Sequence, residues 1–389
     1  MARVLPPLRL AIPAVAATWA LLFEVPRFVG LVNHDPAAND FRLSYVAAQA
    51  GLKWGWSHMY EPDRLRDLSQ AFSNSDPISA LYTYGFPPLL AWVVAPLTLL
   101  PIAAAFYTWT VVNVASFSVA SRLAFPGDIF RWLAVLLVSL AVWPTVFSLE
   151  RGQPELIVYA LAIVSWWLAM RRQERWAGVV LGVAWAIKPQ LLLLLPAVFL
   201  ICGRPRAAAW WLLTTAVAWA VFALVLGSTG LGTYAAVLDW TASDPGFASA
   251  PIVAPFGPTL SLLLGEAIFA LIAIGAVWRQ RRSLRIAFAI GIVGTLASAV
   301  HLHEYDYVGL VVAAWLVLGA EKVTAFDVGW LAIGLICAQL PAIGVRLPIV
   351  LWTPLWLLVL WWRPLTSDQT IPSSQRASSD MRSGVHTGS

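Results

Sequence analysis

The chain has 389 residues, of which 60% are hydrophobic and only 12% are charged. Soluble domains carry about 25% charged residues, so this composition excludes a water-soluble globular enzyme, a disordered chain and a disulfide scaffold. The net charge is +5, and in a membrane protein an excess of basic residues belongs to cytoplasmic loops. We therefore expect an all-α, polytopic integral membrane protein with about ten to twelve transmembrane helices, at ~20 apolar residues per span.

The first apolar run, 8–32, is long enough to stay as a membrane anchor, and the loop that follows it, 33–80, holds six of the twenty acids. A connection of this length is seldom idle. Asp40 to Gln49 predicts a short amphipathic helix, and Leu68 and Phe72 indicate a second one, both lying along the outer membrane surface. Asp40 opens the first of these helices. It is either a solvated loop charge or a general base for an acceptor hydroxyl at the membrane boundary.

The order of the later apolar runs allows two topologies. If every run crosses the membrane, Arg122, Arg131 and the arginines of 171–175 lie outside, against the positive-inside rule. If the Pro-rich run 84–100 is re-entrant and 176–201 is broken at Lys188-Pro189, all arginine-rich loops face the cytoplasm. We favour the second topology, which places both termini in the cytoplasm and the polar clusters at the outer face.

The charged hexapeptide Glu150-Arg151-Gly152-Gln153-Pro154-Glu155 interrupts two apolar helices. Charges are costly in lipid, so such a break is either functional or internally paired, here as a Glu–Arg pair that caps two helix ends. Lys188 lies alone within an apolar run and needs a partner as well. That partner is either an acid such as Glu150 or the phosphate of a lipid ligand.

The segment 301–307 is a further polar cluster, with the sequence HLHEYDY. Two histidines at i and i+2 point apart on a helix, and no HExxH pattern occurs, so we expect no metal site here. A polar site with one titrating histidine is the better interpretation, and a plain interfacial loop is the alternative. No phosphate-binding glycine motif of a nucleotide site occurs, and we expect no nucleic-acid partner.

The expected domain organisation is a single multispan membrane domain over 1–362. The remaining segment, 363–389, is rich in Ser and Thr and lacks periodicity. It is predicted to be a disordered cytoplasmic tail.

The ordered set NDFRLSYVAAQAGLKWGWSHMYEPDRL, YTYGFPPLLAWVVAPLTLLP, ERGQPELIVYAL, AGVVLGVAWAIKPQLLLLLP and HLHEYDY resembles glycosyltransferase family 87. This family comprises polyprenyl-phosphate-sugar-dependent enzymes with the multispan GT-C fold, among them mannosyltransferases and arabinofuranosyltransferases. The resemblance spans roughly Asp40 to Tyr307. It implies an inverting glycosyltransferase of the plasma membrane that moves a hexose or pentose, with mannose favoured, from a polyprenyl-phosphate sugar to a lipid-linked or cell-envelope glycan acceptor at the outer face.

The resemblance also implies roles for residues. Asp40 matches the general base and His303 the histidine that assists it, while Lys188 and Arg151 match the cations that bind the donor phosphate. Supporting positions are Glu150, Gln153, Tyr84, His301 and Asp306. No cofactor is certain, and a divalent metal stays possible.

A secondary transporter or a flippase of a lipid-linked or small polar substrate is the alternative function. A transporter would be expected to show inverted repeats and acids within its spans, whereas here the acids gather at one face. The two classes differ in geometry, because an enzyme requires Asp40, His303 and Lys188 to converge on one cavity that is open to the outer face and to lipid.

Overall fold

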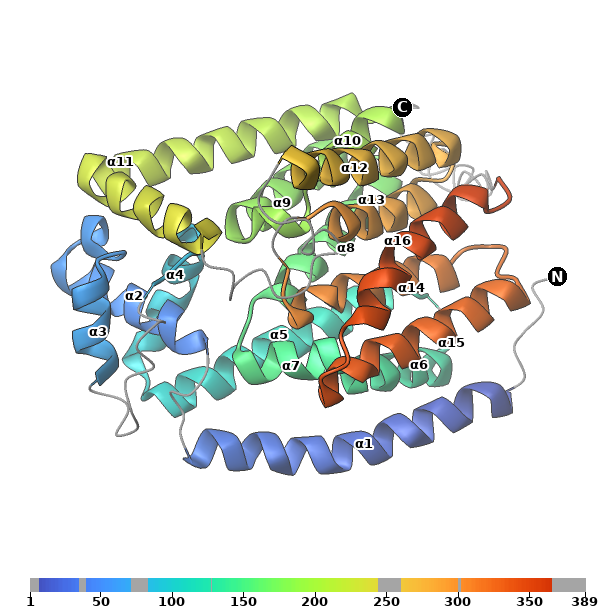
Figure 1. Cartoon of the computed structure of the whole chain (residues 1–389), viewed down its shortest axis with the longest axis horizontal. Coiled ribbons are helices and arrows are strands. Elements are labelled where there is room, and N and C mark those ends of the chain that lie inside the picture. The colour runs from blue at the N-terminus through green and yellow to red at the C-terminus, as the bar shows by residue number, and fades with distance from the viewer. Residues whose placement is uncertain are drawn as a thin grey trace, which may run out of the picture.

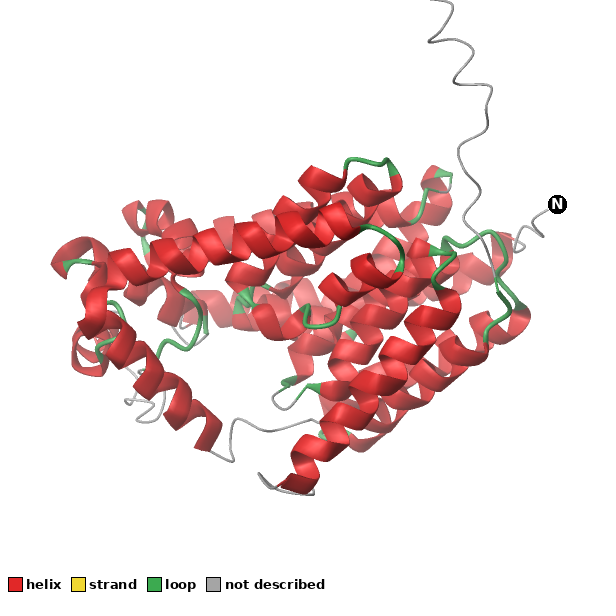
Figure 2. Ribbon diagram, turned by 90° about the horizontal axis from the view of Figure 1, so that it is seen from above, coloured by secondary structure: helices red, strands yellow, loops and turns green. Residues whose placement is uncertain are grey.

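The structure, a computed structural model, describes residues 7–34, 40–70, 83–126, 128–243, 260–299 and 302–365. Within these ranges the chain forms helices joined by short turns, and they contain no strand (Figure 2). The all-α expectation is confirmed. Phe72, His301 and the predicted tail from 366 onward lie outside the described residues.

The helices follow one another along the chain with short connections. The α-helices are α1 Pro7–His34, α2 Phe41–Trp54, α3 Pro62–Gln70, α4 Pro88–Val94, α5 Ile102–Ala124, α6 Ile129–Ala141, α7 Trp143–Arg151, α8 Glu155–Met170, α9 Glu174–Ile187, α10 Leu195–Ile201, α11 Pro205–Ser243, α12 Leu260–Gln280, α13 Leu284–Ser298, α14 Val308–Leu318, α15 Ala325–Gln339 and α16 Leu347–Trp362. The 3-10 helices are η1 Trp56–His58, η2 Ala95–Leu99, η3 Pro189–Leu191, η5 Glu304–Tyr307 and η6 Leu340–Ile343.

The chain is a polytopic membrane protein. Four stretches of described helix are long and apolar enough to cross a membrane: Ala11–His34, Ile102–Ala124, Pro205–Trp240 and Ala325–Ile343. The bent pair α6 and α7 would make a fifth span. Shorter apolar helices occur at Pro88–Leu99, Glu155–Met170, Leu284–Ser298 and Leu347–Trp362. By length alone this is fewer than the expected ten to twelve spans, because breaks within the apolar runs leave several helices short.

Side-chain contacts place the arginine-rich loops on one side of the molecule. Arg285 of α13 donates to the carbonyl of Ala124 at the end of α5 (2.7 Å) and lies over the ring of Trp166 near the end of α8. Arg204, before α11, pairs with Glu174 at the start of α9 (3.0 Å). The loops after α5, α8, α10 and α12 therefore share one side, which is the arrangement of the topology we favoured.

The two irregular segments of that topology are also present. Pro88–Leu99 has twelve residues in two short helices, too few for a span of about 20 residues. Helix α9 ends at Ile187, and Lys188 is extended (φ −150°, ψ 83°) because the following Pro189 disfavours the helical conformation. The predicted break at Lys188-Pro189 is confirmed.

The helix predicted over Asp40–Gln49 is present as α2, which runs five residues further to Trp54, but it packs into the core instead of lying along the surface. It contacts α3, α4 and η2, and the Tyr45 hydroxyl donates to the carbonyl of Leu100 (2.7 Å). Helix α3 keeps a surface pattern, with only Leu65 and Ser69 buried. The three helices α2, α3 and α4 lie together at the left end of the molecule in Figure 1, below the kinked end of α11.

Candidate active site

The break between α7 and α8 is fixed by Gly152. Its backbone is left-handed (φ 67°), a region that disfavours residues with a Cβ. A Cβ on Gly152 would stand 2.6 Å from Cβ of Phe41 and 2.7 Å from Cε2 of Phe106. The indole N–H of Trp109 also donates to the Gly152 carbonyl (2.8 Å). The segment 150–155 is thus held tightly against α2 and α5.

Replacing Gly152 by alanine should destabilise the fold by more than backbone strain alone, which costs about 1–2 kcal/mol for a left-handed residue. The added methyl group would also overlap Phe41 and Phe106. Thermal unfolding in detergent measures the loss. The matched control is Gly203→Ala, because Gly203 has nearly the same φ (71°) with nothing within 4 Å of an added Cβ. Equal losses in both variants would contradict the close-packing argument.

Asp40 is presented to this segment from the start of α2. As the residue before a helix it would ordinarily accept from helix amides, but its carboxylate makes no such bond to the described helix. Instead Nε2 of Gln153 donates to its Oδ2 (2.7 Å). Burial raises the pKa of Asp40 above its ordinary value, and this effect outweighs the opposing influence of Arg151, Gln153, Lys188 and Arg42.

Lys188 lies between two carboxylates. Its ammonium pairs with Glu155 and with Oδ1 of Asp306 (2.7 Å), and all three side chains are buried. The remaining acceptors are used as well, since Ser148 donates to Glu155 (3.0 Å) and the backbone N–H of His303 donates to Asp306 (2.6 Å). The partner that Lys188 was expected to need is therefore internal, and it consists of Glu155 and Asp306, not Glu150.

The segment 302–307 joins the same region. The ring of His303 is half-buried, with its centroid 5.0 Å from that of Tyr305. Glu304 accepts from the indole of Trp143 (2.8 Å) and pairs with Arg346 (2.5 Å), which ties this segment to α7 and to the start of α16. Among the described residues no group of three His, Cys, Asp or Glu side chains is arranged to hold a metal ion.

Arg151 is the exposed cation of the site. Its guanidinium lies 5.1 Å from the ring centroid of Phe147, which stacks in turn on Trp143 and Tyr305 with centroids 5.2 and 5.9 Å away. It also interacts electrostatically with Asp40. Its neighbour Glu150 pairs with Arg27 of α1, so Glu150 anchors the segment to another helix. This ion pair differs from the Glu–Arg pair within 150–155 that was the alternative interpretation of the segment.

Tyr84, expected to support the site, is buried in a cluster of aromatic rings. Its ring contacts Tyr60 and Phe86, with centroids 5.6 and 5.8 Å away, and its hydroxyl donates weakly to the carbonyl of Pro87 (3.4 Å). These contacts fix the turn into α4. Tyr84 thus contributes through packing near the site.

Asp40, Lys188 and the segment that carries His303 lie in one region of the structure. The Asp40 carboxylate is near enough to interact electrostatically with Lys188 and with Tyr305, and Lys188 and His303 share Asp306. Sequence reasoning gave Glu155 no role. The sequence nevertheless contained a signal for a Glu155–Lys188 pair. An acid at the start of an apolar helix needs a cation, and Lys188 is a lysine within an apolar run.

Comparison with known proteins gives one match. The model of glycosyltransferase family 87 matches residues 82–302, more than half of the 389 residues. No curated protein and no solved structure matches the chain. The matched stretch contains 150–155 and Lys188, while Asp40 and the segment 303–306 lie outside it and are brought to it by folding. The chain belongs to glycosyltransferase family 87 and is a membrane glycosyltransferase, which decides between this class and the transporter alternative.

Proposed function

We propose that the enzyme transfers a sugar, with mannose favoured, from a polyprenyl-phosphate donor to a lipid-linked or cell-envelope glycan acceptor at the outer face of the plasma membrane. The observation that carries this proposal is the position of Asp40, a half-buried carboxylate with a raised pKa beside the exposed cation Arg151. A displacement at a sugar phosphate needs a base that takes the proton of the acceptor hydroxyl and a cation that stabilises the leaving phosphate. Asp40 and Arg151 can supply these two groups.

The distribution of arginine-rich loops supports a reaction at the outer face of the membrane. The arginine-rich loops lie on one side of the molecule, which the positive-inside rule assigns to the cytoplasm. Helix α1 starts on that side and ends next to the Asp40 side, where Asn33 accepts from Tyr107 near the start of α5. The end of α16 lies on the arginine side, since Gln280 donates to the Arg363 carbonyl (2.8 Å). Both ends of the described membrane domain are then cytoplasmic.

The mechanism is a single inverting displacement. The Asp40 carboxylate takes the proton of an acceptor hydroxyl, and the acceptor oxygen bonds to the anomeric carbon as the bond from that carbon to the phosphate oxygen breaks. Polyprenyl phosphate leaves with the bonding electrons, and Arg151 stabilises its charge. The half-buried ring of His303 lies against Tyr305, which interacts electrostatically with Asp40, and we assign His303 the assisting role. A phosphate leaving group needs no strong general acid, so a second catalytic carboxylate is not required.

The two cations then have different roles. Lys188 is buried and paired with two carboxylates, so binding a phosphate would require it to give up strong internal interactions. Arg151 is exposed in the same region. We therefore assign the donor phosphate to Arg151, and assign to Lys188 the positioning of the segments that carry Arg151, Gln153 and His303.

The assay that tests the donor class uses the purified enzyme in phospholipid vesicles with radiolabelled sugar donors. Polyprenyl-phosphate mannose should support transfer to a membrane glycan acceptor, and GDP-mannose alone should not. Transfer from the nucleotide sugar by the purified enzyme would contradict the proposed donor. Transfer from a polyprenyl-phosphate pentose in place of mannose would keep the donor class and change the sugar.

Replacing Arg151 by glutamine should raise the KM for the donor about 10- to 100-fold, since a hydrogen bond to a charged group contributes about 1.5–3 kcal/mol. Steady-state kinetics with varied polyprenyl-phosphate sugar measures the effect. Arg171→Gln is the matched control, because Arg171 also ends an apolar helix and lies over an aromatic ring, that of Trp167, but stands on the arginine side. An unchanged donor KM in the Arg151 variant would refute the phosphate assignment.

The pH profile should report the environment of Asp40. Because the base must be ionised and burial raises its pKa, kcat/KM should fall with decreasing pH at a higher pH than the ordinary aspartate value of ~3.9 allows. The Gln153 hydrogen bond lowers this pKa, so Gln153→Ala should move the acid limb to still higher pH. An acid limb that moves to lower pH in that variant would speak against Asp40 as the titrating base.

A further inference from the structure

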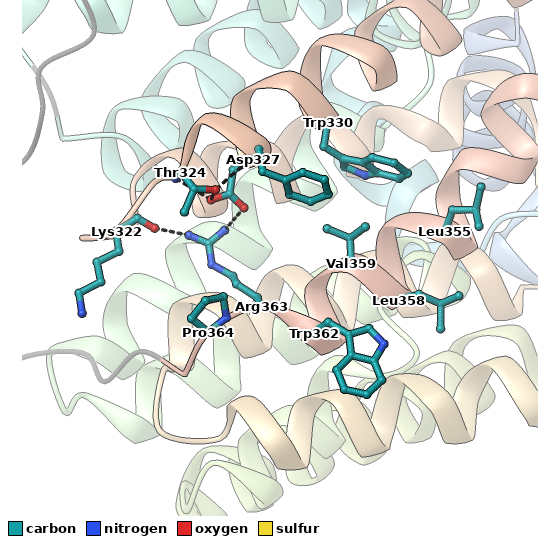
Figure 3. Close-up of a pocket in the computed structure, with 11 residues that line it drawn as sticks. Lys322, Thr324, Asp327, Trp330, Leu355, Leu358, Val359, Trp362, Arg363 and Pro364 are labelled. Carbon is teal, nitrogen blue, oxygen red and sulfur yellow. Dashed lines mark hydrogen bonds and ion pairs between the residues drawn. The ribbon is translucent and has the colours of Figure 1, made fainter.

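A groove of about 480 Å³ lies between the first turns of α15 and the last turns of α16 (Figure 3), and none of the residues that line it belongs to the site of Asp40. Its two ends differ in character. Lys322, Thr324, Asp327 and Arg363 gather at one end, whereas the rest of the lining is made by apolar and aromatic side chains, among them Trp330, Leu355, Leu358 and Trp362.

The polar end is built rigidly. Thr324 caps α15 by accepting from the Asp327 amide (3.1 Å), and Asp327 accepts in return from the Thr324 amide (2.8 Å). Arg363 donates to Oδ1 of Asp327 (2.6 Å) and to the carbonyl of Lys322. The Asp327 and Arg363 charges cancel within this buried pair. Lys322 and Glu321 next to it are both exposed, and Arg279 of α12 lies near the Trp362 ring (5.8 Å), so these three residues leave a net charge of about +1 at this end.

The apolar part faces outward from the helices. Trp362 is 73% exposed and Leu358 44%, which is unfavourable in water but ordinary against hydrocarbon. Leu355 stands about 12 Å from Arg363 along α16, at ~1.5 Å per residue. The groove therefore runs from a positive end, on the side of the arginine-rich loops, to an apolar wall some two helical turns deeper.

We propose that this groove binds a membrane phospholipid with an anionic headgroup, its phosphate beside Lys322 and one acyl chain along Trp330, Leu358 and Trp362. Charge complementarity selects the headgroup, because basic sites between membrane helices on the cytoplasmic side attract anionic lipids. The chain's own segment 366–389 fits the wall poorly, since its sequence is dominated by Ser, Thr and charged residues. The bound lipid would link α15, α16 and α12 on the side opposite the catalytic site.

The test is lipid retention by the full-length protein in detergent, measured by native mass spectrometry with dioleoyl-phosphatidylglycerol and dioleoyl-phosphatidylcholine. Wild type should retain phosphatidylglycerol preferentially. Lys322→Gln should weaken the apparent affinity for phosphatidylglycerol about fivefold and leave phosphatidylcholine unchanged. Lys53→Gln, an identical change in the exposed lysine of α2, should behave like wild type. No preference in wild type, or equal effects of both lysine variants, would overturn the proposal.

A second measurement identifies the occupant. Leu358→Trp should fill the groove and lower retention of both lipids. A photo-crosslinking amino acid at position 358, activated in vesicles containing phosphatidylglycerol, should give an adduct with the mass of that lipid. A crosslink to the segment 366–389 or to a second copy of the chain, with no lipid adduct, would instead show that another partner covers the groove and would overturn the proposal.

Discussion

Replacing Asp40 by asparagine should lower sugar transfer by about 10²- to 10⁴-fold, the usual contribution of a positioned general base. Asparagine keeps the shape of the side chain and can still accept from Gln153, so the start of α2 should keep its structure. What is lost is a group able to take the acceptor proton. Transfer from polyprenyl-phosphate mannose by purified protein measures kcat, and the donor KM should change little because the donor phosphate is assigned to Arg151.

The control for this variant is Asp63→Asn, which also lies between α1 and α4. The Asp63 side chain is 86% exposed and pairs with Arg66 on the surface of α3, so its removal should leave transfer unchanged. If a well-folded Asp40 variant transferred sugar at the wild-type rate, Asp40 would not be the base. If both variants lost activity to the same degree, the effect would lie in the whole segment between α1 and α4.

Replacing Lys188 by methionine should destabilise the protein by about 3–5 kcal/mol, since it leaves Glu155 and Asp306 buried without a cation. The affected helices carry the segments 150–155 and 302–307, so activity should be lost together with the fold. Unfolding temperature in detergent, and the yield of monodisperse protein, measure the loss. Lys53→Met provides the control, because Lys53 is exposed on α2.

A compensated variant separates the two roles that Lys188 can have. Lys188→Met combined with Glu155→Gln and Asp306→Asn removes all three buried charges together, a change that is often tolerated far better than the loss of one partner. If Lys188 only positions the loops, this triple variant should regain stability and bind the donor with a near-normal KM. Restored stability with a strongly raised donor KM would show instead that Lys188 contacts the phosphate.

Much of the membrane architecture was predictable from local pattern. Apolar runs give helices irrespective of their partners, because backbone groups in lipid must bond within the segment. Pro189 disfavours a helical conformation at Lys188, which predicts a helix end there. The positive-inside rule favours the topology in which all arginine-rich loops lie on one side. The helix that opens at Phe41 was likewise visible in the sequence. Its burial was not, because its many alanines and aromatic residues suit a surface helix and a core helix alike.

The residues of the candidate site could be proposed from the sequence, but which of them pair with one another could not. Composition left few charges in the membrane domain, so Asp40, the segment 150–155, Lys188 and the segment 301–306 stood out by their rarity. Which charge neutralises which depends on distances across segments more than 100 residues apart, as for Lys188 and Asp306.

The sequence by itself determined that this chain is an all-α membrane protein that resembles glycosyltransferase family 87. It also singled out the polar segments of the candidate site, since burial in lipid allows a charge only where something compensates it. Only the tertiary structure decided that Lys188 is held by two buried carboxylates, that Glu150 turns to Arg27, and that Arg151 remains exposed beside Asp40. The physical reason is that ion pairing depends on the separation of charges in space, and helix packing alone sets that separation.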